Sequence, residues 1–416
     1  MKKFVIIKLL LCLILISFLS VDYASGENKG DAITWNKTFG GSSEDMGFSI
    51  IQTKNGGYAI AGYTVLPRRE KKDDWRTKLG YIILEKSYKQ DFWIIKLDKN
   101  GNMEWDEAFG EEETDVARSI IQTKDGGYAV VGSIWTKYAS KQDFWLIKLD
   151  ENGDKEWEKT FDKDEHDIAY SIIDTKDGGY AIAGGTGKRF WGEVNCWVIK
   201  LDAKGNMEWD NNFGGTGWDE IYSIIQTKGG SFIAAGSVWS KGAGRGDVCV
   251  VKLDRRGYLV WTKTFGGSDY DEARSIIQTD DGGYAVAGFT ILEDTGDRDV
   301  WVIKLDKEGN KIWDKTLGGT SEDWANSIIQ TEDRGYMVAG WTSSMGAGKT
   351  DVWIIKLNKR GDLVWDKTFG GSKDDEAHSI VQTEDGGYAV AGWTKSKGAG
   401  NSDVWVIKLD RNGNLQ

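Results

Sequence analysis

The sequence predicts an all-β protein in which a unit of four antiparallel strands is repeated seven times and closes into a ring. The first observation is a 52-residue pattern that recurs from Trp35 to Gln416. The serine that opens it lies 52 residues from the next in every step but the first, which is 70 residues long and so contains an 18-residue insertion. The second observation is a tryptophan with the same spacing, at Trp35, Trp105, Trp157, Trp209, Trp261, Trp313 and Trp365. A further tryptophan would fall at position 417, where Trp35 can supply the residue, as a closed ring requires.

Each repeat contains four short β-patterned runs separated by turns. In the second repeat the first run is Ser119–Thr123, and an Asp-Gly-Gly turn leads to Tyr128–Gly132. Glycine suits this turn because tight hairpins require positive φ. The third run is Phe144–Leu149, and a turn leads to the fourth, Trp157–Phe161. The glycine of that turn recurs at Gly101, Gly153, Gly205, Gly257, Gly309, Gly361 and Gly413. No stretch after the N-terminal segment has a sustained 3.6-residue apolar period, so we expect no helix there.

Four antiparallel strands in a period of about 50 residues are typical of a β-propeller blade. The predicted fold is therefore a seven-bladed β-propeller over residues 35–416. A linear β-solenoid is the alternative, but its coils are usually shorter and its ends need atypical caps. The chain instead begins at a fourth strand and ends with the first three strands of another repeat. We expect the N-terminal strand at Trp35–Phe39 to complete the last blade in a velcro closure.

The N-terminal segment has the features of a signal peptide over residues 1–26. Lys2 and Lys3 form a basic start, Leu9–Leu19 is apolar, and small residues around Ala24 suit a cleavage site. The apolar run is too short to favour a transmembrane span. We expect residues 27–34 to be a short linker, the mature chain to have no membrane span, and the protein to be secreted or located at the cell surface.

Composition excludes some partners. The chain carries a formal charge of −12, and removal of residues 1–26 leaves −14. This balance disfavours nucleic acid and anionic membranes and suits calcium, basic partners or solubility. Cys196 and Cys249 are the cysteines that remain, and we expect two core thiols rather than a disulfide. We expect a monomer with no cofactor other than a candidate calcium ion.

The repeat resembles known propeller repeats. The Lys-Leu-Asp-x-x-Gly-Asn-x-x-Trp turn at residues 96–105 is similar to the tryptophan-docking repeat of quinoprotein-type and WD40-like propellers. The whole unit resembles the repeats of secreted and cell-surface prokaryotic propeller proteins, most of which have no assigned biochemical role. This resemblance covers residues 35–416 and implies the fold. The vicinal cysteine pair of quinoprotein dehydrogenases does not occur in the sequence, so their activity is not implied.

Two sets of residues recur in every repeat. Four residues before each serine lies an aspartate, at Asp45, Asp115, Asp167, Asp219, Asp271, Asp323 and Asp375. These carboxylates are either a ring of calcium ligands or acceptors of backbone N–H bonds from the adjacent turn, and we favour the second interpretation. A third-strand set has the same two interpretations: Asp91, Asp143, Asn195, Asp247, Asp299, Asp351 and Asp403. The repeated tryptophans are interpreted as docking residues between blades.

Residues that break the symmetry are better candidates for function. The insertion within residues 65–90 is a solvated loop, a lid or a docking arm, and it contains Trp75. On the same propeller face we expect uneven aromatic residues: Tyr63, Trp218, Tyr270, Phe289, Trp324, Trp341 and Trp393. Aromatic plates beside acids suit sugar rings or a protein interface, and ordinary edge packing is the structural alternative. Glu220, Glu272 and Glu376 are the alternative catalytic residues, because two carboxylates at a suitable distance hydrolyse glycosides.

These features predict an exported binding or scaffold propeller rather than an enzyme. Its ligand would be an extracellular polysaccharide or a surface protein, bound at the loop-rich face. A glycan hydrolase or lyase that uses carboxylates of that face is the first alternative. A structural component of the cell envelope, which would associate with itself, is the second.

Overall fold

The computed structural model describes residues 33–67, 88–111, 113–136, 141–188, 192–292 and 295–415. The predicted signal peptide, most of the linker and most of the insertion, including Trp75, lie outside these residues. Within them all regular structure is β, in 28 strands, and the expectation of an all-β chain is confirmed. No helix long and apolar enough to cross a membrane occurs in this part of the chain.

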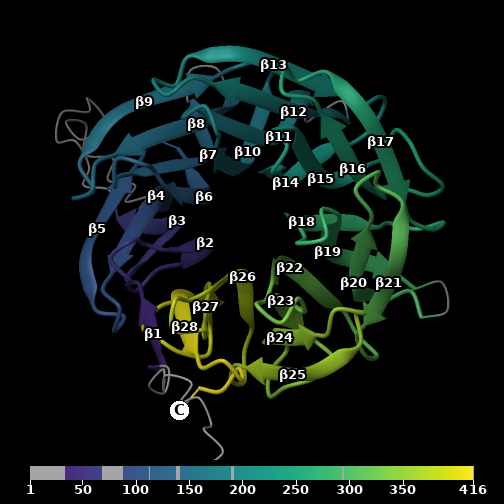
Figure 1. Ribbon diagram of the computed structural model, residues 1–416. Coiled ribbons are helices and arrows are strands. Elements are labelled where there is room, and N and C mark those ends of the chain that lie inside the picture. The colour runs from purple at the N-terminus through teal and green to yellow at the C-terminus, as the bar shows by residue number, and fades with distance from the viewer. Residues whose placement is uncertain are drawn as a thin grey trace, which may run out of the picture.

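The strands are arranged radially around a central axis, with four antiparallel strands per repeat (Figure 1). The innermost are β2 (Asp45–Gln52), β6 (Val116–Gln122), β10 (His166–Asp174), β14 (Glu220–Gln226), β18 (Glu272–Gln278), β22 (Asp323–Gln330) and β26 (Asp375–Gln382). The second are β3 (Tyr58–Pro67), β7 (Tyr128–Thr136), β11 (Tyr180–Lys188), β15 (Phe232–Val238), β19 (Tyr284–Ile291), β23 (Tyr336–Thr342) and β27 (Tyr388–Thr394).

The third and fourth strands complete each repeat toward the outside. The third are β4 (Tyr88–Leu97), β8 (Lys141–Leu149), β12 (Glu193–Leu201), β16 (Asp247–Leu253), β20 (Arg298–Leu305), β24 (Asp351–Leu357) and β28 (Asp403–Leu409). The outermost are β1 (Trp35–Phe39), β5 (Met103–Phe109), β9 (Lys155–Phe161), β13 (Met207–Phe213), β17 (Leu259–Phe265), β21 (Lys311–Leu317) and β25 (Leu363–Phe369).

Hydrogen bonding groups the strands into six sheets, five with four strands and one with eight. The eight-stranded sheet consists of β6–β9 and β10–β13, which are joined by one parallel pair, His166 with Gln142. The first strand, β1, pairs antiparallel with β28, from Trp35 opposite Lys408 to Phe39 opposite Val404. The beginning and the end of the described chain therefore share one sheet.

The core lies between neighbouring repeats. Small and branched residues of the second and third strands are fully buried, such as Ala129, Val131 and Leu146, and they pack against Ala169 and Ile172 of the next repeat. Small residues allow the sheets to approach closely, while Val and Ile suit the pleated surface. Each repeat thus buries its apolar face only by packing against its neighbours, which explains why the pattern recurs so regularly.

The repeated tryptophans pack on the repeated turn glycines. Gly309 has a φ of 81°, and a Cβ at this position would lie 2.8 Å from the ring of Trp261 in the preceding repeat. Glycine is required here both for the positive φ and for the close approach of the ring. The same pairing joins Trp35 with Gly101, Trp105 with Gly153, Trp157 with Gly205, Trp209 with Gly257, Trp313 with Gly361 and Trp365 with Gly413.

The repeated serines link the innermost strands. Each serine hydroxyl accepts the backbone N–H of an isoleucine in the next repeat, at 3.2–3.3 Å. The bond from Ile50 to Ser379 connects the first repeat with the last. This contact gives the invariant serine a structural role. The two cysteines are free and buried in one cluster, which agrees with the expected pair of core thiols.

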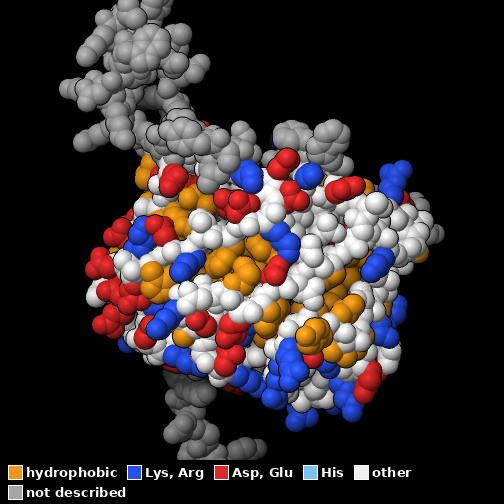
Figure 2. Space-filling view, turned by 90° about the horizontal axis from the view of Figure 1, so that it is seen from above, with side chains coloured by type: hydrophobic (Ala, Val, Ile, Leu, Met, Phe, Trp, Pro, Cys, Tyr) orange, Lys and Arg blue, Asp and Glu red, His pale blue; other side chains and the backbone are white. Residues whose placement is uncertain are grey.

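The outer edge shows separate hydrophobic groups among charged side chains, as Figure 2 shows from the side of β13. Exposed apolar residues begin several outermost strands, including Met207 and Leu259, and Tyr258 in the preceding turn is 67% exposed. Charged side chains between such groups keep unpaired strand edges from joining other sheets.

Candidate ligand-binding site

One position of the innermost strand varies around the ring and carries five residue types in seven repeats. It directly precedes the repeated serine, and we call its residues the axial ring: Phe48, Arg118, Tyr170, Tyr222, Arg274, Asn326 and His378. In each strand the register with the second strand shifts at this residue, which marks a β-bulge. A bulge re-aims a side chain, and bulges are common beside functional sites.

Six of the seven axial ring residues, all except Asn326, contact one another from repeat to repeat. The rings of Tyr170 and Tyr222 lie 4.8 Å apart, and the Arg274 guanidinium lies 4.3 Å from the centre of the Tyr222 ring. Arg118 lies 5.1 Å from Tyr170 and 5.5 Å from Phe48. Cation–π contacts of this kind are attractive and orient the guanidinium groups.

The last repeat joins the first through the same ring. Phe48 packs edge-on against His378, with 5.0 Å between the ring centres, and also against Tyr63 at 5.9 Å. The indole N–H of Trp393 donates to Nε2 of His378 at 3.2 Å. Tyr63 and Trp393, both predicted ligand residues, are only 5% and 6% exposed. They support the axial ring from behind rather than present a free surface.

Two of the alternative catalytic residues lie within this network. Glu220 accepts hydrogen bonds from the hydroxyls of Tyr170 at 3.1 Å and Tyr222 at 2.7 Å. Burial raises the pKa of Glu220, and the negative charge of Glu272 raises that pKa further. Glu272 is 2% exposed and contacts both the guanidinium of Arg274 and the hydroxyl of Tyr270. Both carboxylates are therefore held in fixed positions.

The third alternative catalytic residue, Glu376, lies elsewhere on the ring. Its carboxylate is 3.5 Å from Nε2 of His378. The structure thus brings Glu220 and Glu272 within electrostatic reach of each other and pairs Glu376 with a histidine.

An aromatic band runs across three neighbouring repeats. It consists of Trp239, Tyr270, Phe289, Trp324 and Trp341, with successive ring centres 5.6, 5.4, 4.2 and 5.5 Å apart. The Trp324 and Trp341 rings are stacked, with 17° between their planes. Trp239 is 45% exposed, Phe289 is fully buried, and the other three side chains are half-buried. The band is therefore exposed to solvent at Trp239 and packed within the protein at Phe289.

Polar groups border the aromatic band. Arg274 and Arg298 lie 5.4 and 5.5 Å from the Trp324 ring, and Arg298 also pairs with Glu322 at 2.5 Å. The indole N–H of Trp324 is buried and has no hydrogen-bond partner among the described residues. Buried donors without partners are uncommon, and a ligand acceptor would satisfy this one.

Four of the predicted ligand residues, Tyr270, Phe289, Trp324 and Trp341, thus come together in the band. Trp218 does not join them by a ring contact; it is half-buried and forms a parallel bridge with Val194. At the ends of the insertion, Val65 and Gln90 line a cavity of about 540 Å³ together with Ser42, Ser43, Glu44, Thr114 and Asn401. The cavity lies where the sequence predicted a binding face, but it is not lined by aromatic residues.

The seven repeated aspartates are buried and anchored. Each accepts a backbone N–H bond of 2.7–2.9 Å from the residue four positions earlier: Gly41, Glu111, Lys163, Gly215, Gly267, Gly319 and Gly371. This is the hydrogen-bonded interpretation favoured from the sequence. Burial still disfavours the charged form of Asp115, whose pKa is raised to about 6 mainly because the carboxyl is desolvated.

The axial ring, Trp239 and Arg298 were not among the residues predicted from the sequence. A signal was present, because the residue before each serine varies from repeat to repeat while the serine itself does not. A single sequence does not show which variable positions of a strand face one another across the repeats.

No family model matches the chain. Regulatory protein FlaEY of Caulobacter vibrioides is 24% identical in an alignment of 201 residues, and the match covers 43% of this chain and 20% of that protein. The chain therefore matches about a fifth of the length of this relative.

Among solved structures, puromycin hydrolase aligns with a TM-score of 0.52 and 11% identity, over 89% of this chain and 53% of that one. The WD40 domain of Neurospora crassa Pan2 aligns with a TM-score of 0.50 and 11% identity, over 91% and 96%. At this identity the likeness concerns the fold alone. It shows that the fold of the chain is propeller-like.

Proposed function

We propose that the protein is an exported seven-bladed β-propeller that binds an extracellular polysaccharide at the aromatic band. We treat β6–β9 and β10–β13 as two separate blades, because only one residue pair joins the two sets of strands. Export rests on the signal-peptide features of residues 1–26.

Ring closure is supported by contacts between the first and last repeats. Besides the ladder of β1 and β28, the Asp45 N–H donates to the Ser402 carbonyl at 2.9 Å. Ile50 and Tyr58 share a hydrophobic cluster with Ala389 and Val404. These are the same kinds of contact that join neighbouring repeats elsewhere, so the closing interface resembles the internal ones.

The observation that carries the binding proposal is the band itself, with its exposed end at Trp239 and its stacked pair of tryptophans. Aromatic faces stack on the apolar faces of sugar rings, while sugar hydroxyls need both donors and acceptors. Donors border the band at Arg274 and at the unpartnered indole N–H of Trp324, and the exposed carboxylate of Glu322, beside Arg298, is an acceptor. Aromatic side chains and arginine are also the typical anchors of binding surfaces.

A polysaccharide is favoured over a surface protein because the exposed area is narrow. Only Trp239 of the band is largely exposed, and the others are half-buried or buried. A stable protein interface commonly buries about 800 Å² on each partner. A chain of sugar rings can instead follow a row of aromatic side chains a few ångströms apart.

A glycan hydrolase is the second candidate, because one observation favours it. Glu220 has a raised pKa and lies near the carboxylate of Glu272, and a general acid needs such a neighbour and such a shift. Against it, both carboxylates are buried and engaged by tyrosine hydroxyls or arginine.

The test incubates the purified protein with a panel of extracellular polysaccharides and scores retention and new reducing ends together. Retention without new reducing ends is expected. New reducing ends that disappear in a Glu220→Gln variant would replace the binding proposal by the hydrolase. Absence of retention by every polysaccharide would contradict the proposal and leave a protein ligand or self-association in the envelope.

A further inference from the structure

One repeat carries an aspartate where the six others carry glycine. The residue after the outermost strand is Asp162 in this repeat and Gly40, Gly110, Gly214, Gly266, Gly318 and Gly370 elsewhere. In the other repeats this glycine lies against two side chains, the third-strand residue of its own repeat and the innermost-strand aspartate of the next; Gly266, for example, lies against Asp247 and Asp271. The substitution therefore adds a third carboxylate to an existing pair.

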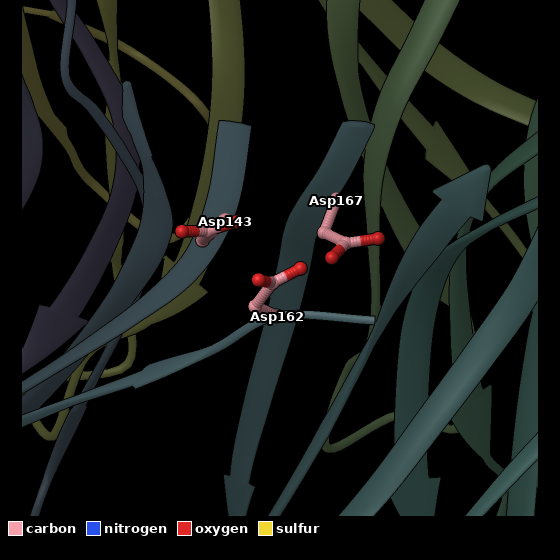
Figure 3. Close-up of side chains that lie close together, drawn as sticks. All are labelled: Asp143, Asp162 and Asp167. Atoms are coloured by element: carbon pink, nitrogen blue, oxygen red, sulfur yellow. The ribbon is translucent and has the colours of Figure 1, made fainter. Parts of the chain in front are cut away.

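The three carboxylates converge. Asp143 at β8, Asp162 after β9 and Asp167 in β10 each offer an oxygen, and these oxygens lie within 4.8 Å of one another (Figure 3). Calcium binds oxygens at about 2.4 Å, so two ligands on opposite sides of the ion lie about 4.8 Å apart. In the part of the chain that the structure describes, these three side chains form a group whose geometry can hold a metal ion.

Buried oxygens of this group have no hydrogen-bond partner. Asp143 is 7% exposed and Asp167 is fully buried, yet Oδ1 of each has no partner in the part of the chain that the structure describes. Oδ2 of Asp167 is occupied by the N–H groups of Lys163 and Asp164. A buried carboxylate oxygen is costly to leave unpaired, so these two Oδ1 atoms are suited to bind a cation.

Thr186 adds a further oxygen. It is opposite Asp167 in the ladder of β10 and β11, and it is 3% exposed. At the equivalent place in the first repeat, Oγ1 of Thr64 donates to Asp45 at 2.5 Å. The Thr186 hydroxyl is near enough to Asp167 to favour its charged form, but its oxygen lacks hydrogen-bond geometry to any described partner.

We propose that Asp143, Asp162 and Asp167 bind a calcium ion, with the Thr186 hydroxyl and water available to complete its coordination. Carboxylate and hydroxyl oxygens are hard ligands, which suit calcium. Asp162 is exposed, so the ion has a route from solvent. Lys141 lies 3.4 Å from Asp162, but this pair is at the surface, where ion pairs contribute little.

Burial and mutual repulsion disfavour the charged forms of these carboxylates, and Lys141 offsets this only in part. Burial raises the pKa of Asp143 to about 6, and the charge of Asp162 adds to this. Burial likewise raises the pKa of Asp167 to about 6, with a contribution from Asp143. A divalent cation would reverse these effects, because it neutralises the repulsion between the carboxylates.

The test compares the wild type with Asp162→Gly, which restores the residue found in the other repeats. After treatment with EDTA, calcium is titrated by isothermal calorimetry, and melting temperature is followed with and without calcium. The wild type should bind one calcium at this site, with a dissociation constant of roughly 0.1–1 mM as in extracellular modules, and melt at a higher temperature with calcium. Asp162→Gly should bind calcium at least about ten-fold more weakly and lose that shift.

A second measurement separates binding from folding. Without calcium, Asp162→Gly should melt at the same or a higher temperature than the wild type, because one of three repelling charges is gone. Asp247→Asn, in a repeat with glycine at the equivalent position, should bind calcium like the wild type. A wild type that binds no calcium, or calcium binding that Asp162→Gly leaves unchanged, would overturn the proposal.

Discussion

One of the contacts that support the proposed closure of the ring can be removed by deleting a single side-chain atom. The Ser379 hydroxyl accepts the N–H of Ile50 at 3.2 Å, across the seam between the last and first repeats. The Ser379→Ala variant deletes this acceptor and changes little volume. Loss of one partner of a buried hydrogen bond costs about 1–3 kcal/mol, and since this contact is part-buried we expect about 1–2 kcal/mol.

The matched control is Ser223→Ala. Its hydroxyl accepts the N–H of Ile276 at 3.2 Å, between two internal repeats. In a closed ring both variants lower the free energy of unfolding equally, as measured by equilibrium denaturation with urea. If Ser379→Ala is neutral while Ser223→Ala is destabilised, the first and last repeats are not joined and the reasoning fails.

Three further predictions concern turns, buried charges and pH. Gly309→Ala should lose roughly 2 kcal/mol or more of stability in urea denaturation, because φ at Gly309 is 81° and the new Cβ would meet the Trp261 ring. The control, Gly267→Ala, should be near neutral because a Cβ there has open space. Equal effects of the two variants would contradict the docking role of Trp261. Lys148→Met should lose about 2 kcal/mol in the same assay, because the buried Lys148 ammonium group binds Glu156 and the Leu149 carbonyl, each at 2.9 Å. The control is Lys155→Met, which removes an exposed ion pair and should have little effect. A neutral Lys148→Met would refute the predicted role of the buried ion pair. Asp115→Asn should gain roughly 2–3 kcal/mol of stability relative to the wild type as pH rises from 4 to 7. The pKa of Asp115 is raised to about 6 in the folded state, so between these pH values the carboxyl ionises more readily in the unfolded chain, which destabilises the folded wild type. A stability difference between the two proteins that does not change with pH would contradict this prediction.

The fold was predictable because the period of the sequence reflects the period of the structure. The serine, the tryptophan and the turn glycine each occupy a fixed contact between neighbours, as Trp261 does against Gly309. Residues with such roles cannot vary, so their spacing is visible in a single sequence. The anchoring of the aspartates was also accessible, since an acid four residues after a glycine turn is a local arrangement.

The candidate site was less predictable, because it depends on contacts between repeats. The sequence identifies aromatic residues at the loop edges, such as Tyr270 and Phe289. Their spacing does not show that Trp239 extends the same row. Phe289 is fully buried, while Trp239 is largely exposed, and the sequence does not separate these cases. Asp162 was likewise not predictable, since a single glycine replaced by aspartate becomes meaningful only beside Asp143 and Asp167.

The most direct test of the account measures retention of the Trp239→Ala, Trp341→Ala double variant on the polysaccharide that retains the wild type. Tyr258→Ala, which removes an aromatic residue exposed on the outer edge, is the control. Truncation of an anchoring aromatic residue commonly costs 2 kcal/mol or more, so we expect the double variant to bind at least about 30-fold more weakly. Tyr258→Ala should bind like the wild type. If the double variant folds and is retained as strongly as the wild type, the aromatic band is not the binding site.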